Sequence, residues 1–254
     1  MSCPDIRLSR LGLTGAALLA ALAVTGAAAA QSIVVRSTGP SASKYPAGTK
    51  LKASDRVALV DGDKVVLMQG GKTRTLSGKG SFTVGATVQA SQSMGTTVTR
   101  MLAKGPSTRA RGGFAREAET AAPSEFRAPN LWLLDYRSGG TFCVADPATL
   151  MLWRPDMSGD AALTIAKGGQ SETVALVAGA QFRKWPTETL PIEYGVDYQL
   201  SGAGLTAPVT VRFATIAAMP ETADAATEIL MTKGCTPQLD RLVDAMSEAE
   251  AVDG

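Results

Sequence analysis

The sequence predicts a mainly β protein with two small antiparallel β-sandwich or roll domains, joined by a helix and a flexible linker and followed by a C-terminal helical tail. Short β-branched runs alternate with Gly and Pro turns over residues 31–85 and again over residues 130–218. Residues 105–129 are poor in apolar side chains, which favours a linker. After Pro220 the apolar residues recur at helical spacing. We therefore expect five segments: a signal peptide (1–30), a first β domain (31–85), a helix and flexible basic linker (86–129), an immunoglobulin-like sandwich (130–218) and a C-terminal helical segment (219–254).

Residues 1–30 have the pattern of a secretory signal peptide. Arg7 and Arg10 form a basic start, residues 11–23 are apolar, and Ala28 and Ala30 place small side chains before a cleavage site. We expect cleavage after Ala30 and a periplasmic or secreted product. An uncleaved anchor is the alternative, because the apolar stretch is roughly long enough to span a bilayer. No later stretch is that long, so we expect no integral membrane segment after cleavage.

Charge and composition exclude several classes of function. Lys and Arg total 25 against 23 for Asp and Glu, a formal net charge of +2, so overall charge does not indicate a nucleic-acid partner. The chain has no histidine, which removes imidazole metal ligands and the Ser-His-Asp and Cys-His nucleophile systems. No cysteines occur at metal-ligand spacing. We expect neither a cofactor nor a metal.

Two cysteines, Cys143 and Cys235, remain after the predicted cleavage. In an oxidising compartment such a pair is most simply explained as one disulfide, and two separate buried thiols are the alternative. The bridge would close a long loop and would hold the C-terminal segment against the second β domain.

The first β domain consists of short strands and turns. Residues 57–60 and 65–68 flank the polar sequence Asp-Gly-Asp-Lys, which predicts a hairpin. Gly70 and Gly71 then predict a turn into a strand over 72–76, and Gly78 and Gly80 lead into a strand over 82–84.

This order of strand, Asp-Gly, strand, Gly-Gly, strand and Gly-x-Gly-Ser-Phe over residues 57–84 resembles the periplasmic β-domain of FecR-type proteins. The resemblance is limited to the first β domain. It implies a β-rich periplasmic module used in binding or signalling. The inner-membrane helix and cytoplasmic anti-sigma segment of that family have no counterpart here, so transmembrane signalling is not expected.

The connecting segment begins with apolar residues at near-helical spacing, which predict a helix over about 86–103. From the end of this helix onward, five basic residues occur without an intervening acid: Arg100, Lys104, Arg109, Arg111 and Arg116. The C-terminal residues 221–254 are acidic in balance. Docking of the basic segment on an anionic surface is one interpretation, and a solvated linker with a solvated helix face is the favoured one.

Turn residues divide the second β domain into eight candidate strands at 131–134, 141–144, 150–153, 162–166, 172–177, 181–185, 198–201 and 209–216. Trp132, Trp153 and Trp185 are expected to fill the core, with a ligand platform as the alternative. Behind Pro220, a helix over 223–231 should begin at Thr222 or Glu221 and stop at Gly234. A second helix should start near Pro237 and pack on the sandwich.

Three short motifs resemble functional signatures but lack their companions. Ser41 to Lys44 matches the Ser-x-x-Lys of penicillin-recognising enzymes, without the other two motifs of that class. Gly71-Lys72-Thr73 lacks the earlier P-loop glycine. Asp61-Gly62-Asp63 lacks the further ligands of a calcium loop. We interpret all three as turns.

The sequence therefore favours an exported, non-enzymatic binding or scaffolding protein whose partner is an envelope protein or polymer. Loops at 146–155 and 185–195 are the predicted contact surface, because β-sandwiches commonly bind through their end loops. The alternative is a hydrolase or transferase that acts on cell-envelope polymers with carboxylates alone. Its candidate acids are Glu172, Glu188, Glu193 and Asp197.

Overall fold

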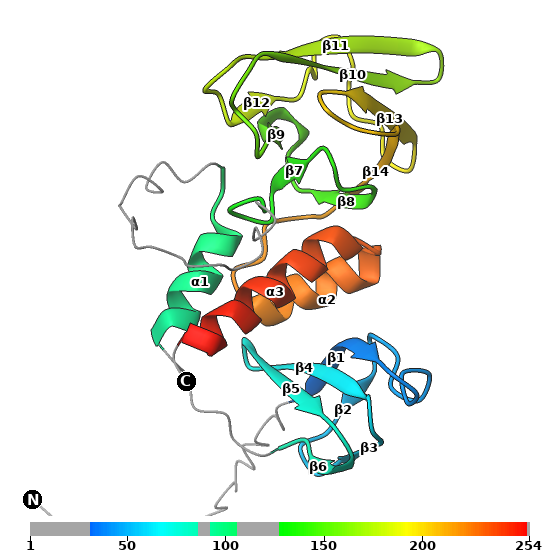
Figure 1. Cartoon of the computed structure of the whole chain (residues 1–254), viewed down its shortest axis with the longest axis vertical. Coiled ribbons are helices and arrows are strands. Elements are labelled where there is room, and N and C mark those ends of the chain that lie inside the picture. Colours follow the sequence, from blue (N-terminus) through cyan, green and yellow to red (C-terminus); the bar gives the residue numbers. More distant parts are fainter. Residues whose placement is uncertain (1–30, 86–91, 106–126, 253–254) are drawn as a thin grey trace, which may run out of the picture.

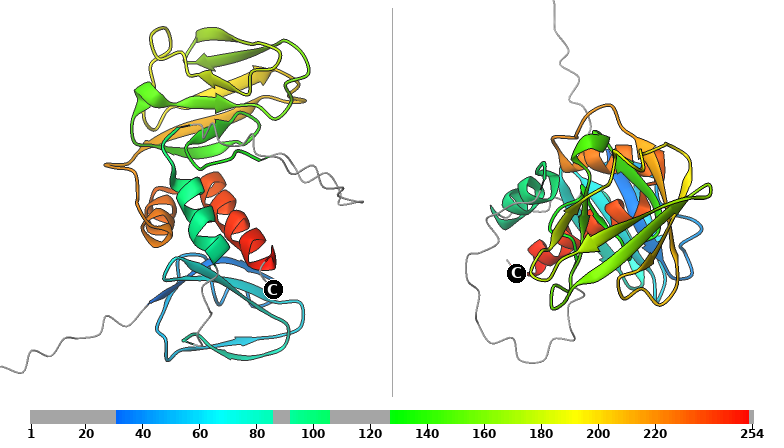
Figure 2. Two further views of the ribbon diagram at one scale, coloured as in Figure 1. Left: turned by 90° about the vertical axis from the view of Figure 1, so that its left-hand side faces the viewer. Right: turned by 90° about the horizontal axis from the view of Figure 1, so that it is seen from above.

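The computed structural model describes residues 31–85, 92–105 and 127–252. It confirms a mainly β protein, with 38% of residues in strands and 19% in helices. The β strands lie at the two ends of the molecule and the helices form a layer between them (Figures 1 and 2). The predicted signal peptide and most of the predicted linker lie outside the described residues.

The N-terminal β unit, residues 31–85, contains two antiparallel sheets. The four-stranded sheet has the order β2-β1-β4-β5, formed by Lys50–Leu51, Ser32–Thr38, Lys64–Gln69 and Lys72–Ser77. The second sheet pairs β3 (Arg56–Leu59) with β6 (Gly80–Thr83). Gly70 and Gly71 have φ angles of 57° and 72°, so the predicted two-residue turn between β4 and β5 is confirmed.

The predicted hairpin between residues 57–60 and 65–68 is wrong. β3 pairs with β6, whereas β4 lies between β1 and β5. The polar turn exists, but it carries the chain from one sheet to the other. The buried carboxylate of Asp63 holds this crossing, because it accepts hydrogen bonds from the backbone N–H groups of Val60 (2.7 Å) and Ser41 (2.8 Å). Val57 and Val65 consequently face each other across one core.

The interaction with Asp63 also explains the Ser41 motif. Ser41 lies in a turn, and its backbone is anchored by the Asp63 carboxylate. Asp63 has a lowered pKa because the Ser41 hydroxyl and then the backbone N–H groups of Ser41 and Val60 stabilise its charge. The group is a turn-stabilising carboxylate in this fold.

Three helices, α1 (Gln92–Leu102), α2 (Ala223–Lys233) and α3 (Thr236–Val252), form the middle layer. Val66 and Met68 of β4 pack against them, in one core with Leu230 and Met246. Val65 and Leu67 point to the opposite face of the same strand, into the core of the N-terminal β unit. The strand is therefore apolar on both faces, and the helical tail packs on the N-terminal sheet as well as on the second β region.

The helix boundaries follow the predicted capping residues. The Thr222 hydroxyl accepts the N–H of Ala225 at the start of α2, and Gly234 ends this helix in the left-handed region with φ 70°. Within the described part of the chain, no helix combines the length and the apolar character that a membrane crossing requires.

All eight predicted strands of the second β region, residues 130–216, are present. One sheet has the order β11-β10-β13-β14-β8 and the other β12-β9-β7, and a shared core lies between them. The strands are β7 (Leu133–Asp135), β8 (Gly140–Val144), β9 (Met151–Trp153), β10 (Ala161–Lys167), β11 (Gln170–Leu176), β12 (Phe182–Lys184), β13 (Asp197–Gly202) and β14 (Val209–Thr215).

The prediction of purely antiparallel sheets is corrected at two places. β8 runs parallel to β14, and β7 runs parallel to β9. The first pairing has a clear cause in the helical layer. Cys143 of β8 and Ile216, just after β14, both join the core formed with the helices, so both strands run toward that layer. Trp132, Trp153 and Trp185 are buried in three different clusters, which confirms that they fill the core.

Candidate functional site

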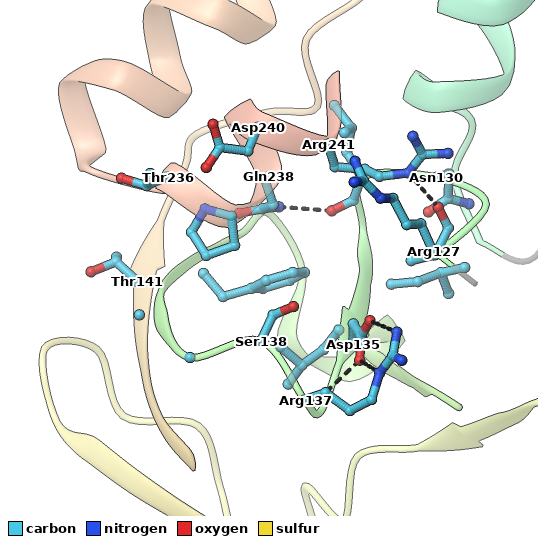
Figure 3. Close-up of a pocket in the computed structure, with 18 of the residues that line it drawn as sticks. Arg127, Asn130, Asp135, Arg137, Ser138, Thr141, Thr236, Gln238, Asp240 and Arg241 are labelled. Carbon is cyan, nitrogen blue, oxygen red and sulfur yellow. Dashed lines mark hydrogen bonds and ion pairs between the residues drawn. The ribbon is translucent and has the colours of Figure 1, made fainter. Parts of the chain in front are cut away.

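A cavity of about 780 Å³ lies where the second β region meets the start of α3 (Figure 3). One wall is the connection between β7 and β8, including Asp135, Ser138 and Gly140. The opposite wall is the first turns of α3, including Gln238 and Arg241. We call this space the junction cavity. Cavities of this size between two packed elements are typical of ligand sites.

The wall from β7 to β8 is ordered by a local ion pair. Arg137 donates from Nε (2.9 Å) and from its backbone N–H (3.0 Å) to Asp135 Oδ1, and from Nη2 (2.7 Å) to Asp135 Oδ2. The backbone N–H of Ser138 donates to the carbonyl of Asp135 at 2.9 Å. Gly140 then turns the chain into β8 with a φ angle of 101°, a conformation that strongly favours glycine. The Asp135–Arg137 pair therefore orders this wall of the cavity.

The α3 wall is anchored by the disulfide and by one buried amide. Cys143 of β8 is bonded to Cys235, just before α3, across 92 residues of sequence, which confirms the predicted pairing. Gln238 is buried, and its Nε2 donates to the carbonyls of Leu131 (2.9 Å) and Cys143 (3.1 Å). Its Oε1 accepts the N–H of Cys143 at 2.6 Å.

Because β8 is an edge strand, its outward backbone groups need partners. The Gln238 amide takes the place of a neighbouring strand at Cys143, because it pairs with both the N–H and the carbonyl of that residue. Figure 3 shows the buried Gln238 side chain beside the cavity. Helix α3 is thus attached to β8 both covalently and by hydrogen bonds. The first turn of the helix, which has no acidic residue, borders the cavity.

Ion pairs link α2 and α3 to the N-terminal β unit. Arg36 of β1 donates to Asp240 (2.7 Å) and to Asp244 (2.9 Å), and Arg127 also pairs with Asp244. Lys50 of β2 pairs with Glu228 of α2 at 3.1 Å. Asp240 and Glu228 keep half or more of their side-chain surface exposed, in line with the favoured interpretation of a solvated face, and they form ion pairs in addition, whereas Asp244 is largely covered.

Arg241 is the cation of the junction cavity that lacks a carboxylate partner among the described residues. Its Nε donates to the carbonyl of Ala128 at 2.9 Å, while its buried Nη1 has no hydrogen-bond partner in the described part of the chain. Burial lowers the pKa of this guanidinium, and the positive charges of Arg127 and Arg100 lower it further, against the opposite effect of Glu248.

Arg154 shows how this fold satisfies an arginine that has only a structural role. Arg154 is buried, and its guanidinium donates to the carbonyls of Asp156, Gly159, Leu176 and Val177. These bonds tie together two loops of the second β region. Arg241, in contrast, has one acceptor among the described residues and borders a cavity.

The loops predicted to form the contact surface lie elsewhere. Asp146, Thr149 and Leu150 border a small cavity of about 70 Å³ next to Cys143. The loop at 185–195 borders neither this space nor the junction cavity, and Trp185 is buried in the core. The junction cavity is not among the sites that the sequence predicts, although the expected disulfide already placed the start of α3 beside β8.

The four acids of the hydrolase alternative do not converge on a described cavity. Glu193 pairs with Lys167 at 2.8 Å, and Asp197 pairs with Arg212 at 2.7 Å. Glu172 lies in the edge strand β11, and Glu188 is exposed. None of them lines the junction cavity. Among the residues that the structure describes, no group of three or more Cys, Asp or Glu side chains is arranged to hold a metal ion.

The predicted basic segment is described only in part. Arg100 lies at the end of α1, close enough to Arg241 to affect its pKa, whereas Arg109, Arg111 and Arg116 lie outside the described residues.

In comparisons with known proteins, no family model, no curated protein and no solved structure matches the chain. The resemblance of residues 57–84 to FecR-type domains therefore stays a prediction.

Proposed function

We propose that the protein is an exported, non-enzymatic binding or scaffolding module that holds its ligand in the junction cavity. In this proposal residues 31–85 are a FecR-like β domain and residues 130–218 are an immunoglobulin-like sandwich. The observation that carries it is a cavity of about 780 Å³ bordered by polar groups from two elements that are fixed to each other. This volume is in the range of sites for small ligands.

The attachment of α3 supports a binding role. A site binds more tightly when its walls are already in place, because less conformational entropy is lost on association. The disulfide at Cys143 and the hydrogen bonds of Gln238 hold the α3 wall, and the Asp135–Arg137 pair holds the opposite wall. The cavity can therefore bind its ligand without a large rearrangement. We propose that this ligand is part of an envelope protein or polymer.

Filling the cavity should remove binding without unfolding the protein. Ser138 is exposed and borders the cavity, so Ser138→Trp places an indole in the space that a ligand would occupy. The mature chain, residues 31–254, is incubated with an envelope extract, recovered by gel filtration and examined by native mass spectrometry. We expect an added mass on the natural protein and none on S138W.

Ser171→Trp is the matched control, because Ser171 is equally exposed but lies on the edge strand β11 and does not border the cavity. S171W should retain the added mass. The same mass on S138W, or no added mass on the natural protein, would contradict the proposal. Turnover of an envelope glycan that depends on one of the four candidate acids would instead favour the hydrolase alternative.

A further inference from the structure

The walls of the junction cavity carry three arginines, Arg127, Arg137 and Arg241, against two acids, Asp135 and Asp240, among the described residues. Asp135 is engaged by Arg137, and Asp240 is engaged by Arg36. Arg127 shares Asp244 with Arg36, so that carboxylate is divided between two guanidinium groups. Arg241 then remains without a carboxylate partner among the described residues.

We infer that the ligand of the junction cavity is an anion that carries carboxylate or phosphate groups, bound by Arg241 and Arg127. This inference rests on the proposed function, since it names the chemistry of the ligand for the same site. Figure 3 shows Arg127 and Arg241 side by side with Asn130 at one end of the cavity, away from the Asp135–Arg137 pair.

Hydrogen bonding at Arg241 supports this assignment. An unpaired polar atom of a charged group costs free energy when it is buried, and the cost is recovered when an acceptor reaches it. Nη1 of Arg241 is such an atom, and Arg127 is exposed over the same end of the cavity. Because Nη1 is buried in this structure, a ligand oxygen reaches it when the half-buried Arg241 side chain turns toward the cavity. Carboxylates and phosphates match this planar group in two parallel hydrogen bonds.

The start of α3 adds to the positive electrostatic potential of the cavity. α3 spans 17 residues and has no acidic side chain in its first turn, where Thr236 and Gln238 border the cavity. The partial positive charge of a helix N-terminus favours an anion placed near it. Asn130 is already engaged, because its Nδ2 donates to the carbonyl of Gly105 and its Oδ1 accepts the N–H of Trp132. Asn130 therefore orders the chain beside Arg127 and Arg241, and its amide is not available to bind the ligand.

The test is calorimetric titration of the mature, disulfide-bonded chain with citrate and with pyrophosphate, which separate carboxylate from phosphate recognition. We expect at least one of them to bind, and the affinity to fall as NaCl rises from about 0.05 M to about 0.5 M. Arg241→Gln should weaken binding about tenfold or more, because it removes a charge-assisted hydrogen bond. Arg241→Lys should retain a larger part of the affinity than R241Q.

Arg183→Gln is the matched control, because Arg183 is exposed on β12, away from the cavity, and loses the same charge. R183Q should bind like the natural protein. Failure of both anions to bind, or equal affinity of R241Q and the natural protein, would overturn the inference. If native mass spectrometry detects an uncharged ligand that S138W loses, the proposed function stands and only the anionic ligand is rejected.

Discussion

Replacing Cys143 and Cys235 together by alanine should lower the free energy of unfolding by about 4 kcal/mol. The bond closes a segment with a sequence separation of 92, and a loop of this length restricts the unfolded chain strongly. Both sulfurs are buried in the core that the helices share with the two β parts of the molecule. The loss should therefore be visible in urea unfolding of the double variant C143A/C235A followed by circular dichroism.

The natural protein treated with a reductant is the control for this variant, since it loses the bond but keeps both sulfur atoms. Its unfolding free energy should fall by nearly the same amount. A difference of less than about 1 kcal/mol between oxidised and reduced protein would contradict a structural role for the bridge. Hydrogen exchange should quicken first in α3, which would then be attached to β8 only through side-chain contacts.

Gln238→Leu should lower the free energy of unfolding by about 3 kcal/mol. Leucine has a similar volume, so the change removes hydrogen bonds without opening a large cavity. It leaves the N–H and carbonyl of Cys143 and the carbonyl of Leu131 without the amide that satisfies them. Buried backbone groups that lose their partners account for the size of the effect.

Gln199→Leu is the matched control for Gln238→Leu. Gln199 is exposed on β13, and its side chain donates to the Thr210 hydroxyl. Loss of this surface bond should change stability by about 0.5 kcal/mol or less. Equal stabilities of Q238L and Q199L, measured in the same urea titration, would show that the amide at position 238 is not needed on the β8 edge.

The sequence predicts the strands well and their partners poorly. The Gly168-Gly169 turn marks the end of β10 and the start of β11, and a capping threonine and a left-handed glycine mark the ends of α2. These are local preferences that the residues themselves carry. Whether β3 pairs with β4 or with β6 depends instead on which faces are buried across the whole domain. β4 is buried on both faces, with Val65 and Val66 on opposite sides, and the reason becomes clear only once the helical layer is known to cover one face.

The candidate site could be predicted even less, because it is formed by segments that are far apart in sequence. Ser138 and Gln238 border one cavity although 99 intervening positions separate them along the chain. The cysteine pair was the one sequence feature that linked these segments. The sequence predicts a solvated acidic face on α3, whereas Asp240 and Asp244 pair with Arg36, and Arg241 lines the cavity without a carboxylate partner among the described residues.

The central claim is that the junction cavity is the binding site, and a crystal structure of residues 31–254 soaked with pyrophosphate or citrate tests it most directly. The account predicts density for the anion between Arg127, Arg241 and the first turn of α3, with the Cys143–Cys235 bond intact. Density for the anion only on another surface, or a junction cavity closed by neighbouring side chains in the crystal, would contradict it.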